Sequence, residues 1–498
     1  MKNQILKISS NDNVAVALKS LNESDLVLVN NSKLTVKQPI LPGHKIALTT
    51  IKKGERIIKY GFPIGVAMQD IPAGEWVHTH NLKTLLDAET EEYEYHPFHH
   101  EHFLSDESYR FDGFLRKNNL AGVRNEILII PTVGCVNQLC TKLALEFNQK
   151  LLPANVDGVY AFSHQFGCSQ LGDDHLNTQK ILAGLVKHPN AGGVLVVGLG
   201  CENNTVESFQ KILGDYSPER VRFLIAQDVE DEIARGSELL NELVNYATQF
   251  RRQTVPLSSL VVGLKCGGSD GFSGITANPL IGQVADKINE QGGTTILTEV
   301  PEMFGAEKIL MQRCVNETIF QKCVHMINDF KNYYLRNQQP VYENPSPGNK
   351  QGGITTLEEK SLGCIQKGGT SPVVDVLAYG GQVRAKGLNL LSSPGNDPVS
   401  ATALVAAGAQ ILLFSTGRGT PLGAPVPTLK IASNSILAKR KSNWIDFDAG
   451  RMLEHSQQII LREKLFNYII MIASGKLLTK NEENGYRDIA LFKDGVML

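Results

Sequence analysis

Four cysteines in this chain each follow an apolar run and lie next to glycine. They are Cys135, Cys168, Cys201 and Cys266. Apolar runs closed by glycine are typical of buried strands in a parallel sheet, and open α/β sheets bind ligands at the carboxyl edge of such strands. Four ionisable sulfurs at one rim therefore predict a metal centre or a redox-sensitive catalytic site. The alternative is that each thiol is inert core packing, because free cysteine is often buried.

Composition excludes several classes of protein. The net charge is −2 over 498 residues, so no global field favours nucleic acid or an anionic membrane. The N-terminus lacks the apolar core of a signal peptide, and the longest apolar stretch, 401–414, is too short to span a bilayer. We expect a cytoplasmic protein that acts on a small molecule, without nucleic-acid or membrane partners, and a homo-oligomer is compatible with this. In a reducing compartment, eight cysteines indicate buried thiols or ligands rather than disulfides.

The pattern of apolar runs, turn signals and composition along the chain divides it into four segments. Residues 1–82 carry short apolar runs between turn signals, which predicts a small all-β domain. Residues 83–112 are acidic and aromatic and are expected to form a linker. Strand-like and helix-like segments alternate in 113–255 and again in 256–498, which predicts two Rossmann-like α/β domains with parallel sheets. The linker histidines that could also bind a metal are His99, His100 and His102.

Histidines also mark the predicted β domain. His44 lies on a glycine-flanked turn, and His78 and His80 lie two residues apart near the end of the domain. Two residues that are two apart in a strand point to the same face, so this pair could supply half of a metal site. The alternative for the pair is an exposed strand end.

Glycine-rich loops follow in the second half of the chain. The loop 346–353 contains Asn349 and Lys350; it lacks the spacing of a phosphate loop, but its amides and lysine could hold a carboxylate. The loop 415–421 contains Thr416 and places Arg418 between glycines, which suits bidentate binding of a carboxylate. Ordinary surface turns are the alternative for both loops.

A third constellation combines an amine, a thiol and a carboxylate within six residues. Lys265 and Cys266 end an apolar run, and Asp270 follows a pair of glycines. A lysine at such a strand end can serve as a base if desolvation lowers its pKa. The alternative is a solvated lysine on a turn.

Together these motifs resemble the altronate dehydratase family, which also holds galactarate dehydratase. The resembling segments are PGHK (42–45), VHTHN (77–81), GCSQLGDDH (167–175), GLGCENN (198–204), KCGGSD (265–270), NPSPGNK (344–350) and STGRGTP (415–421). The resemblance extends to 490–495 and is closer to the altronate enzymes. It implies an N-terminal SAF (β-clip) domain, an α/β catalytic region, and oxygen-sensitive activity supported by Fe²⁺ or Mn²⁺.

The resemblance implies a sugar-acid dehydratase that converts D-altronate to 2-dehydro-3-deoxy-D-gluconate and water in hexuronate breakdown. Dehydration of galactarate or a related acid, loss of sulfite from a sulfonated hydroxy acid, and a sugar-acid sensor without turnover are the alternatives. The C2 proton of an aldonate is weakly acidic, so its removal needs a positioned base and a cation that stabilises the enediolate. The 3-hydroxyl then leaves and the enol tautomerises to the ketone.

Candidate roles follow from this chemistry. For acid–base catalysis and its orientation the candidates are His44, His164, Lys265 and Asp270; for substrate binding they are Asn349, Lys350, Thr416 and Arg418. A mononuclear Fe²⁺ or Mn²⁺ would have the candidate ligands His78, His80, Glu202 and Glu299. The competing metal hypothesis is a labile iron–sulfur cluster on three of Cys135, Cys168, Cys201 and Cys266, with one iron open to the substrate.

Overall fold

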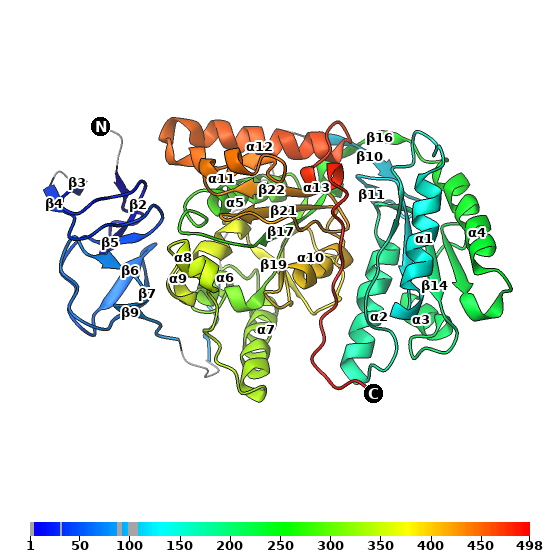
Figure 1. The fold of residues 1–498 in the computed structure, drawn as a ribbon, viewed down its shortest axis with the longest axis horizontal. Helices are drawn as coiled ribbons and strands as arrows, with labels where there is room; N and C mark the ends of the chain where they lie inside the picture. The colour runs from blue at the N-terminus through cyan, green and yellow to red at the C-terminus, as the bar shows by residue number, and fades with distance from the viewer. Residues whose placement is uncertain (1–3, 30–31, 87–91, 98–107) are drawn as a thin grey trace.

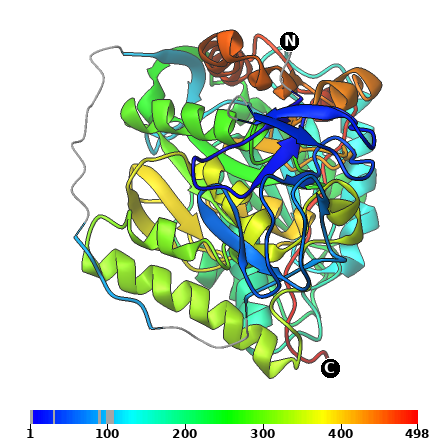
Figure 2. The ribbon, with the colours of Figure 1, turned by 90° about the vertical axis from the view of Figure 1, so that its left-hand side faces the viewer.

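The computed structural model of the chain describes residues 4–29, 32–86, 92–97 and 108–498. Figure 1 shows the N-terminal β domain at one end, the C-terminal α/β domain in the centre and the middle segment of the chain at the other end. Figure 2 shows the β domain seated in front of the C-terminal domain. The linker histidines His99, His100 and His102 lie outside the described residues.

The N-terminal domain is all-β, as predicted. Its strands are β1 (Ile5–Leu6), β2 (Val14–Ala17), β3 (Leu26–Val29), β4 (Ser32–Thr35), β5 (Lys45–Ala47), β6 (Arg56–Lys59), β7 (Phe62–Ala67), β8 (Trp76–Val77) and β9 (Leu82–Lys83). They form antiparallel sheets in the orders β1-β2-β5-β8, β3-β4 and β6-β7-β9. The tight turns between such short strands carry the glycines seen in the sequence, and Gly74 shows why, because its φ is +90° and a Cβ there would lie 2.1 Å from the carbonyl of Thr35.

The middle segment forms a parallel sheet in the order β13-β12-β14-β15, with a small antiparallel sheet, β11-β10-β16, beside it. Its elements are β10 (Arg110–Leu115), β11 (Ala121–Gly122), β12 (Glu126–Pro131), η1 (Gly134–Val136), α1 (Asn137–Asn148), β13 (Val159–Ala161), α2 (Gly172–Lys187), β14 (Ala191–Gly198), α3 (Val206–Leu213), β15 (Val221–Ile225), η2 (Ala226–Asp228), α4 (Glu232–Ala247) and β16 (Arg252–Pro256). Strands β12 and β14 are buried along their whole length, as expected for strands covered by helices on both faces.

The C-terminal domain is built on a seven-stranded parallel sheet in the order β19-β20-β18-β17-β21-β22-β23. Its strands are β17 (Val261–Cys266), β18 (Thr294–Leu297), β19 (Val373–Leu377), β20 (Gly387–Leu391), β21 (Ile411–Thr416), β22 (Thr428–Ala432) and β23 (Phe447–Asp448). The helices are η3 (Leu257–Ser259), α5 (Ala277–Glu290), η4 (Val300–Glu302), α6 (Glu307–Met311), α7 (Glu317–Arg336), α8 (Pro347–Gln351), α9 (Leu357–Cys364), η5 (Ile365–Gly368), α10 (Asp397–Ala406), α11 (Ser435–Arg440), η6 (Gly450–Leu453), η7 (His455–Gln457), α12 (Gln458–Ala473) and α13 (Lys480–Glu483).

The C-terminal tail returns to the middle segment, which the division of the sequence did not anticipate. Arg124 pairs with Glu482, Arg487 pairs with Glu126, and the backbone N–H of Leu498 bonds to a carbonyl before α2. Figure 1 shows this tail running down beside α2.

Among the helices of the described residues, none combines the length and the apolar composition needed to cross a membrane.

Candidate active site

Buried charge is concentrated at the carboxyl edge of the seven-stranded sheet. Lys265 and Cys266 end β17, the central strand of the sheet, which lies between β18 and β21. Glu299 follows β18, and Asp397 begins α10 after β20. Because these strands are parallel, their ends bring the four residues to one edge, which is where open α/β sheets bind ligands.

The side chain of Lys265 is fully buried and bonded on several sides. Its Nζ donates to Glu299, to Asp397 Oδ1 at 2.7 Å and to the carbonyl of the next residue at 2.9 Å. Burial lowers the pKa of Lys265, but the charges of Glu299 and Asp397 outweigh burial and hold the pKa above its ordinary value. The condition for this lysine to act as a base, a pKa lowered by desolvation, is therefore not met. Lys265 is an ammonium group held between carboxyl groups.

Two glutamates near η4 have opposite pKa shifts. Burial, reinforced by the charge of Glu302, raises the pKa of Glu299 well above its usual value. Burial acts on Glu302 as well, but Lys360, 2.8 Å away, and Lys367 outweigh it and lower the pKa of Glu302. Such a divergence is the pattern of paired acid and base groups. Glu299 also has a φ of 72°, a left-handed backbone that non-glycine residues adopt most often at functional sites.

A close pair of thiols completes the cluster. The Sγ atoms of Cys266 and Cys364 are 3.5 Å apart, and Lys367 Nζ donates to Cys266 Sγ at 2.8 Å. The hydrogen bond with Cys364 lowers the pKa of Cys266, and the charge of Lys367 adds to this, while the pKa of Cys364 is raised. Cys266 is thus favoured as a thiolate, the form in which cysteine binds metals and acts as a nucleophile.

Cys266, Glu302 and Cys364 have the spacing of metal ligands. Their ligand atoms all lie within 4.8 Å of one another, and Glu302 Oε2 is 3.1 Å and 3.2 Å from the two sulfurs. Thiolate and carboxylate donors suit Fe²⁺ or Zn²⁺, whereas Mn²⁺ prefers oxygen ligands. A divalent ion here would take over the countercharge that Lys367 now provides to Cys266. The donor set therefore fits a metal ion.

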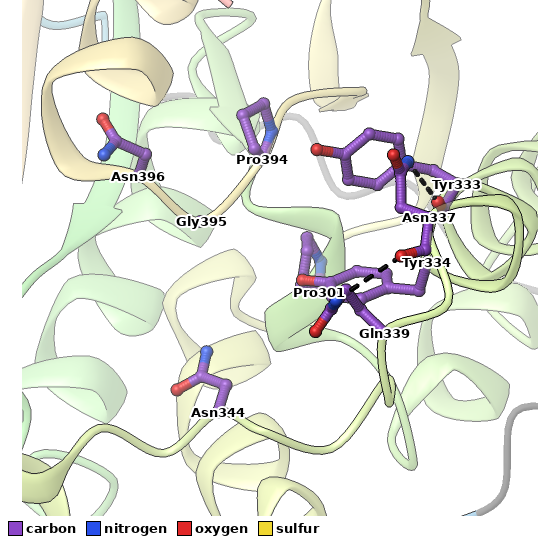
Figure 3. Close-up of a pocket in the computed structure, with 9 residues that line it drawn as sticks. All are labelled: Pro301, Tyr333, Tyr334, Asn337, Gln339, Asn344, Pro394, Gly395 and Asn396. Carbon is purple, nitrogen blue, oxygen red and sulfur yellow. Dashed lines mark hydrogen bonds between the residues drawn. The ribbon is translucent and has the colours of Figure 1, made fainter. Parts of the chain in front are cut away.

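A cavity of about 310 Å³ lies beside this cluster. Its lining residues are Pro301, Tyr333, Tyr334, Asn337, Gln339, Asn344, Pro394, Gly395 and Asn396. Figure 3 shows the cavity between the turn after α7, the loop before α10, and Asn344. Asn344 accepts a hydrogen bond from Lys360 Nζ at 2.8 Å, and Asn396 directly precedes Asp397. The cavity and the charged cluster are therefore parts of one site.

Two glycines lie at the rim above Lys265. A Cβ at Gly267 would lie 2.5 Å from Asp397 Oδ2, and one at Gly268 would lie 3.6 Å from Arg418 Cβ. The side chain of Asp397 is 33% exposed, and Arg418 is exposed. A ligand that approaches the buried lysine therefore meets a carboxylate on one side and a guanidinium on the other, over glycines that allow close approach.

The predicted substrate-binding residues gather around α8 and this rim. Arg418 Nη2 donates to Gln351 Oε1 at 2.8 Å, and Asn349 Nδ2 donates to the carbonyl of Ser269 at 2.8 Å. Lys350 belongs to the same short helix and is half-buried. The hydroxyl of Thr416 accepts from the backbone N–H of Gly419 in the Arg418 turn, so this residue shapes the loop.

Asp270 supports the same rim from below. Its Oδ1 accepts from Ser433 Oγ at 2.7 Å and from Ser273, and its Oδ2 accepts from Asn434. Burial raises the pKa of Asp270, and the hydrogen bonds oppose this shift. With these hydroxyl and amide donors around it, Asp270 positions the loop that carries Arg418.

The β domain binds α8 and α9 through its histidine-bearing edge. His44 Nε2 donates to the carbonyl of Gln351 at 3.2 Å while its Nδ1 accepts from Trp76, an arrangement that requires the neutral ring. Burial, with the charge of Lys45 adding to it, lowers the pKa of His44. His78 bonds Thr355 at 2.9 Å, and the same causes lower its pKa to about 3. Both rings therefore serve the interface in the neutral form.

The remaining candidates lie in other parts of the molecule. His164 Nε2 donates to the carbonyl of Pro131 at 2.8 Å in the middle segment, where Glu202 accepts three hydrogen bonds from its own surroundings. His80 is exposed at the edge of the β domain. The predicted mononuclear ligand set, His78, His80, Glu202 and Glu299, is thus spread over three parts of the chain and is not brought together.

The cysteine prediction divides in the same way. Cys266 is buried in the C-terminal domain, whereas Cys135, Cys168 and Cys201 are exposed at the edge of the middle sheet. Sequence reasoning missed five residues of the cluster: Glu302, Lys360, Cys364, Lys367 and Asp397. Most of them lie on short helices, where a charged residue normally indicates a solvated face.

A parallel-sheet domain that joins buried acidic, basic and thiol groups to a cavity lined by amide and phenol side chains defines an enzyme that acts on a small polar molecule. Residues 257–497 match the family described as D-galactarate/Altronate dehydratase, C-terminal. Residues 113–248 match D-galactarate dehydratase/Altronate hydrolase, second domain, and 3–85 match the Altronate/galactarate dehydratase SAF domain. The chain belongs to the altronate/galactarate dehydratase family, and it is a dehydratase.

Relatives within the family differ in their similarity to this chain. The altronate dehydratases of Escherichia coli (strain K12) and Bacillus subtilis (strain 168) are each 53% identical over 496 residues, which is 99% of this chain and 100% and 99% of theirs. The galactarate dehydratase (L-threo-forming) of Escherichia coli (strain K12) is 33% identical over 513 residues, 98% of this chain and 96% of that one.

Proposed function

We propose that the protein dehydrates D-altronate to 2-dehydro-3-deoxy-D-gluconate and water. The observation that carries this proposal is the 53% identity to two altronate dehydratases along almost the whole chain, against 33% to a galactarate dehydratase. The cavity beside Lys265 supports it, because amide and phenol groups suit the hydroxyl chain of a sugar acid.

The substrate is proposed to lie across Gly267 and Gly268, the two glycines above Lys265. Arg418 would hold its carboxylate by two parallel hydrogen bonds, and the hydroxyl chain would extend past Asn396 into the cavity. This pose brings C2 next to Asp397, the exposed carboxylate of the cluster. Asp397 would take the C2 proton, and Lys265 would stabilise the enediolate charge that develops. The proton for the leaving 3-hydroxyl can come from the Lys265–Glu299 pair, in which the pKa of Glu299 is raised.

The proposed cofactor is Fe²⁺, with Mn²⁺ as the weaker candidate for these donors. Cys266, Glu302 and Cys364 would hold the ion, and the soft sulfurs favour iron. When bound, the ion supplies a Lewis acid for an oxygen of the enediolate. We propose a cytoplasmic location for this activity.

Isotope labelling tests the reaction directly. The purified protein, loaded anaerobically with Fe²⁺, is incubated with D-altronate in D₂O, and the product is followed by NMR. Formation of the 2-keto-3-deoxy acid with one deuterium at C3 is expected, because the enol is protonated there from solvent. Faster turnover of galactarate would reassign the substrate, and altronate binding without any turnover would make the protein a sensor.

A further inference from the structure

Three of the eight cysteines are exposed, and all three lie at one edge of the middle sheet. They are Cys135, Cys168 and Cys201, and the other five cysteines are buried. They follow β12, β13 and β14, which are adjacent parallel strands in the order β13-β12-β14. Because free thiols are normally buried and exposed ones are prone to oxidation, three of them at one sheet edge indicate a ligand.

Strand register starts the three cysteine-bearing loops from nearly the same level of the sheet. Pro131 pairs with Val197, so Cys135 and Cys201 each lie four residues beyond a paired position. Ile129 pairs with Ala161 on the other side, which puts Cys168 within one residue of the same level. Since neighbouring strands are about 4.8 Å apart, the loops that carry the sulfurs leave the sheet side by side.

Hydrogen bonds join these loops to one another. The backbone N–H of Gly134 bonds to the carbonyl of Phe166 at 2.9 Å, and that of Asn204 bonds to the carbonyl of Gly167 at 2.9 Å. A Cβ at Gly167 would lie 2.0 Å from the carbonyl of Thr132, so the closest approach of two loops requires glycine. The residues before and after each cysteine are therefore held in a fixed arrangement.

Buried polar side chains support the same arrangement. Glu202 accepts from Thr132 Oγ1 at 2.6 Å and from the backbone N–H groups of Leu199 and Gly200. These three hydrogen bonds hold the loop that carries Cys201 in place. Ser169, next to Cys168, has a φ of 61° and donates its N–H to Asn203. Strained backbone of this kind is typical of ligand sites.

The three sulfurs are not grouped as closely as the ligands of a single metal ion. Sulfurs on a single tetrahedral ion with bonds of about 2.3 Å lie about 3.8 Å apart. Among the described residues, the three sulfurs do not converge within 4.8 Å of one another, in contrast to the group around Cys266. An iron–sulfur cubane does not require such close convergence, because each thiolate binds a different iron.

We propose that Cys135, Cys168 and Cys201 hold an iron–sulfur cluster of the cubane type, with one iron free of protein thiolate. The site shares no residue with the cluster around Lys265. The cluster proposal can therefore be tested independently of the proposed reaction. It also divides the iron of this protein into two pools, one with inorganic sulfide at the middle sheet and one without it at Cys266.

Iron and sulfide analysis of the full chain tests the proposal. After anaerobic reconstitution with ferrous iron and sulfide, we expect about four labile sulfides per chain and a broad visible absorbance that air exposure removes. The triple variant C135S/C168S/C201S should lose the sulfide and the absorbance. The control Cys323→Ala changes a buried cysteine outside both sites and should keep them.

Two results would overturn the proposal. One is a reconstituted wild-type chain without labile sulfide; the other is a triple variant that keeps its sulfide. Thermal unfolding of each variant checks that it folds, and because the three cysteines are exposed, each single serine variant is expected to unfold near the wild-type temperature. The single variant Cys168→Ser gives a second reading, since loss of one thiolate should make the absorbance more sensitive to air.

Discussion

Glu359 and Lys360 are consecutive residues of α9, yet they bind charged groups in two different parts of the molecule. Glu359 accepts from Lys45 at 2.8 Å and from Lys59 at 2.7 Å, and both lysines belong to the β domain. Lys360 donates to Glu302 at 2.8 Å inside the active-site cluster. One short helix therefore joins the docking of the β domain to the geometry of the candidate catalytic groups.

Glu359→Gln is expected to destabilise the protein by about 3–5 kcal/mol, because it leaves two buried ammonium groups without their carboxylate. Urea unfolding at neutral pH measures the loss. Glu358→Gln is the matched control: its carboxylate is also buried but bonds Thr84 and a backbone N–H rather than a lysine. An equal loss in the two variants would show that the ion pairs with Lys45 and Lys59 have no special weight.

Acid should reduce the difference between the wild type and Glu359→Gln. Burial raises the pKa of Glu359, but Lys45 and Lys59 outweigh it and lower the pKa to about 2. A carboxyl group with a lowered folded-state pKa stabilises the fold above its unfolded pKa of about 4.3, and this contribution fades as the pH falls toward 2. Unfolding curves at several pH values should give a constant gap above about pH 5 and a smaller gap near pH 3. A gap independent of pH would contradict the assignment.

Lys265→Gln is expected to lower kcat by roughly 10²–10⁴-fold, the usual contribution of a positioned acid–base or charged group, with a smaller change in KM. The substitution removes the ammonium group that bridges Glu299 and Asp397. Steady-state kinetics with altronate measure the effect. Lys430→Met removes another buried lysine, next to Asp446, and should leave kcat near the wild-type value. Similar losses in both variants would point to general destabilisation.

Arg418→Lys is expected to weaken substrate binding by roughly 1.5–3 kcal/mol, about 10–150-fold in KM, because lysine cannot make two parallel hydrogen bonds to a carboxylate. Because lysine keeps the positive charge, the substitution does not change the long-range attraction of the anionic substrate. Arg440→Lys, on the exposed end of α11, controls for the exchange itself. Unchanged KM in the Arg418 variant would place it outside the site.

Metal removal should abolish turnover, and Fe²⁺ should restore it better than Mn²⁺. The double variant C266S/C364S is expected to lose the mononuclear iron, which is the iron not bound to inorganic sulfide. The reason is that the variant lacks both sulfur ligands of the buried group. Metal analysis of anaerobic protein measures this, with Cys323→Ala as control. Full turnover in metal-free protein would exclude the ion from the reaction.

Strand ends were the part of the site that the sequence could predict. The apolar runs before Lys265, Cys135 and Cys201 form β17, β12 and β14, and Arg418 follows β21 as expected. A strand-end pattern does not reveal which of two parallel sheets a residue belongs to. Cys266 was therefore grouped with cysteines of the other sheet.

Charged residues on α9 and η5 could not be predicted in the same way. Lys360 and Lys367 look like members of a solvated helix face, but every residue of α9 is buried. Lys360 reaches Glu302 and Lys367 reaches Cys266, while Lys45 and Lys59 of the β domain bind α9 and the loop before it across 308 and 300 residues of chain. Contacts between residues so far apart in the chain leave no pattern in the local sequence from which they could be predicted.

The return of the C-terminal tail has a consequence for the order of folding during synthesis. Arg124 and Glu126 are buried in the middle segment, and their partners Glu482 and Arg487 lie 358 and 361 residues later. At about 5–20 residues per second, ribosomes need roughly 20–70 s to make that interval. Until the tail is made, Arg124 and Glu126 lack these partners, so the middle segment can complete its buried ion pairs only at the end of synthesis.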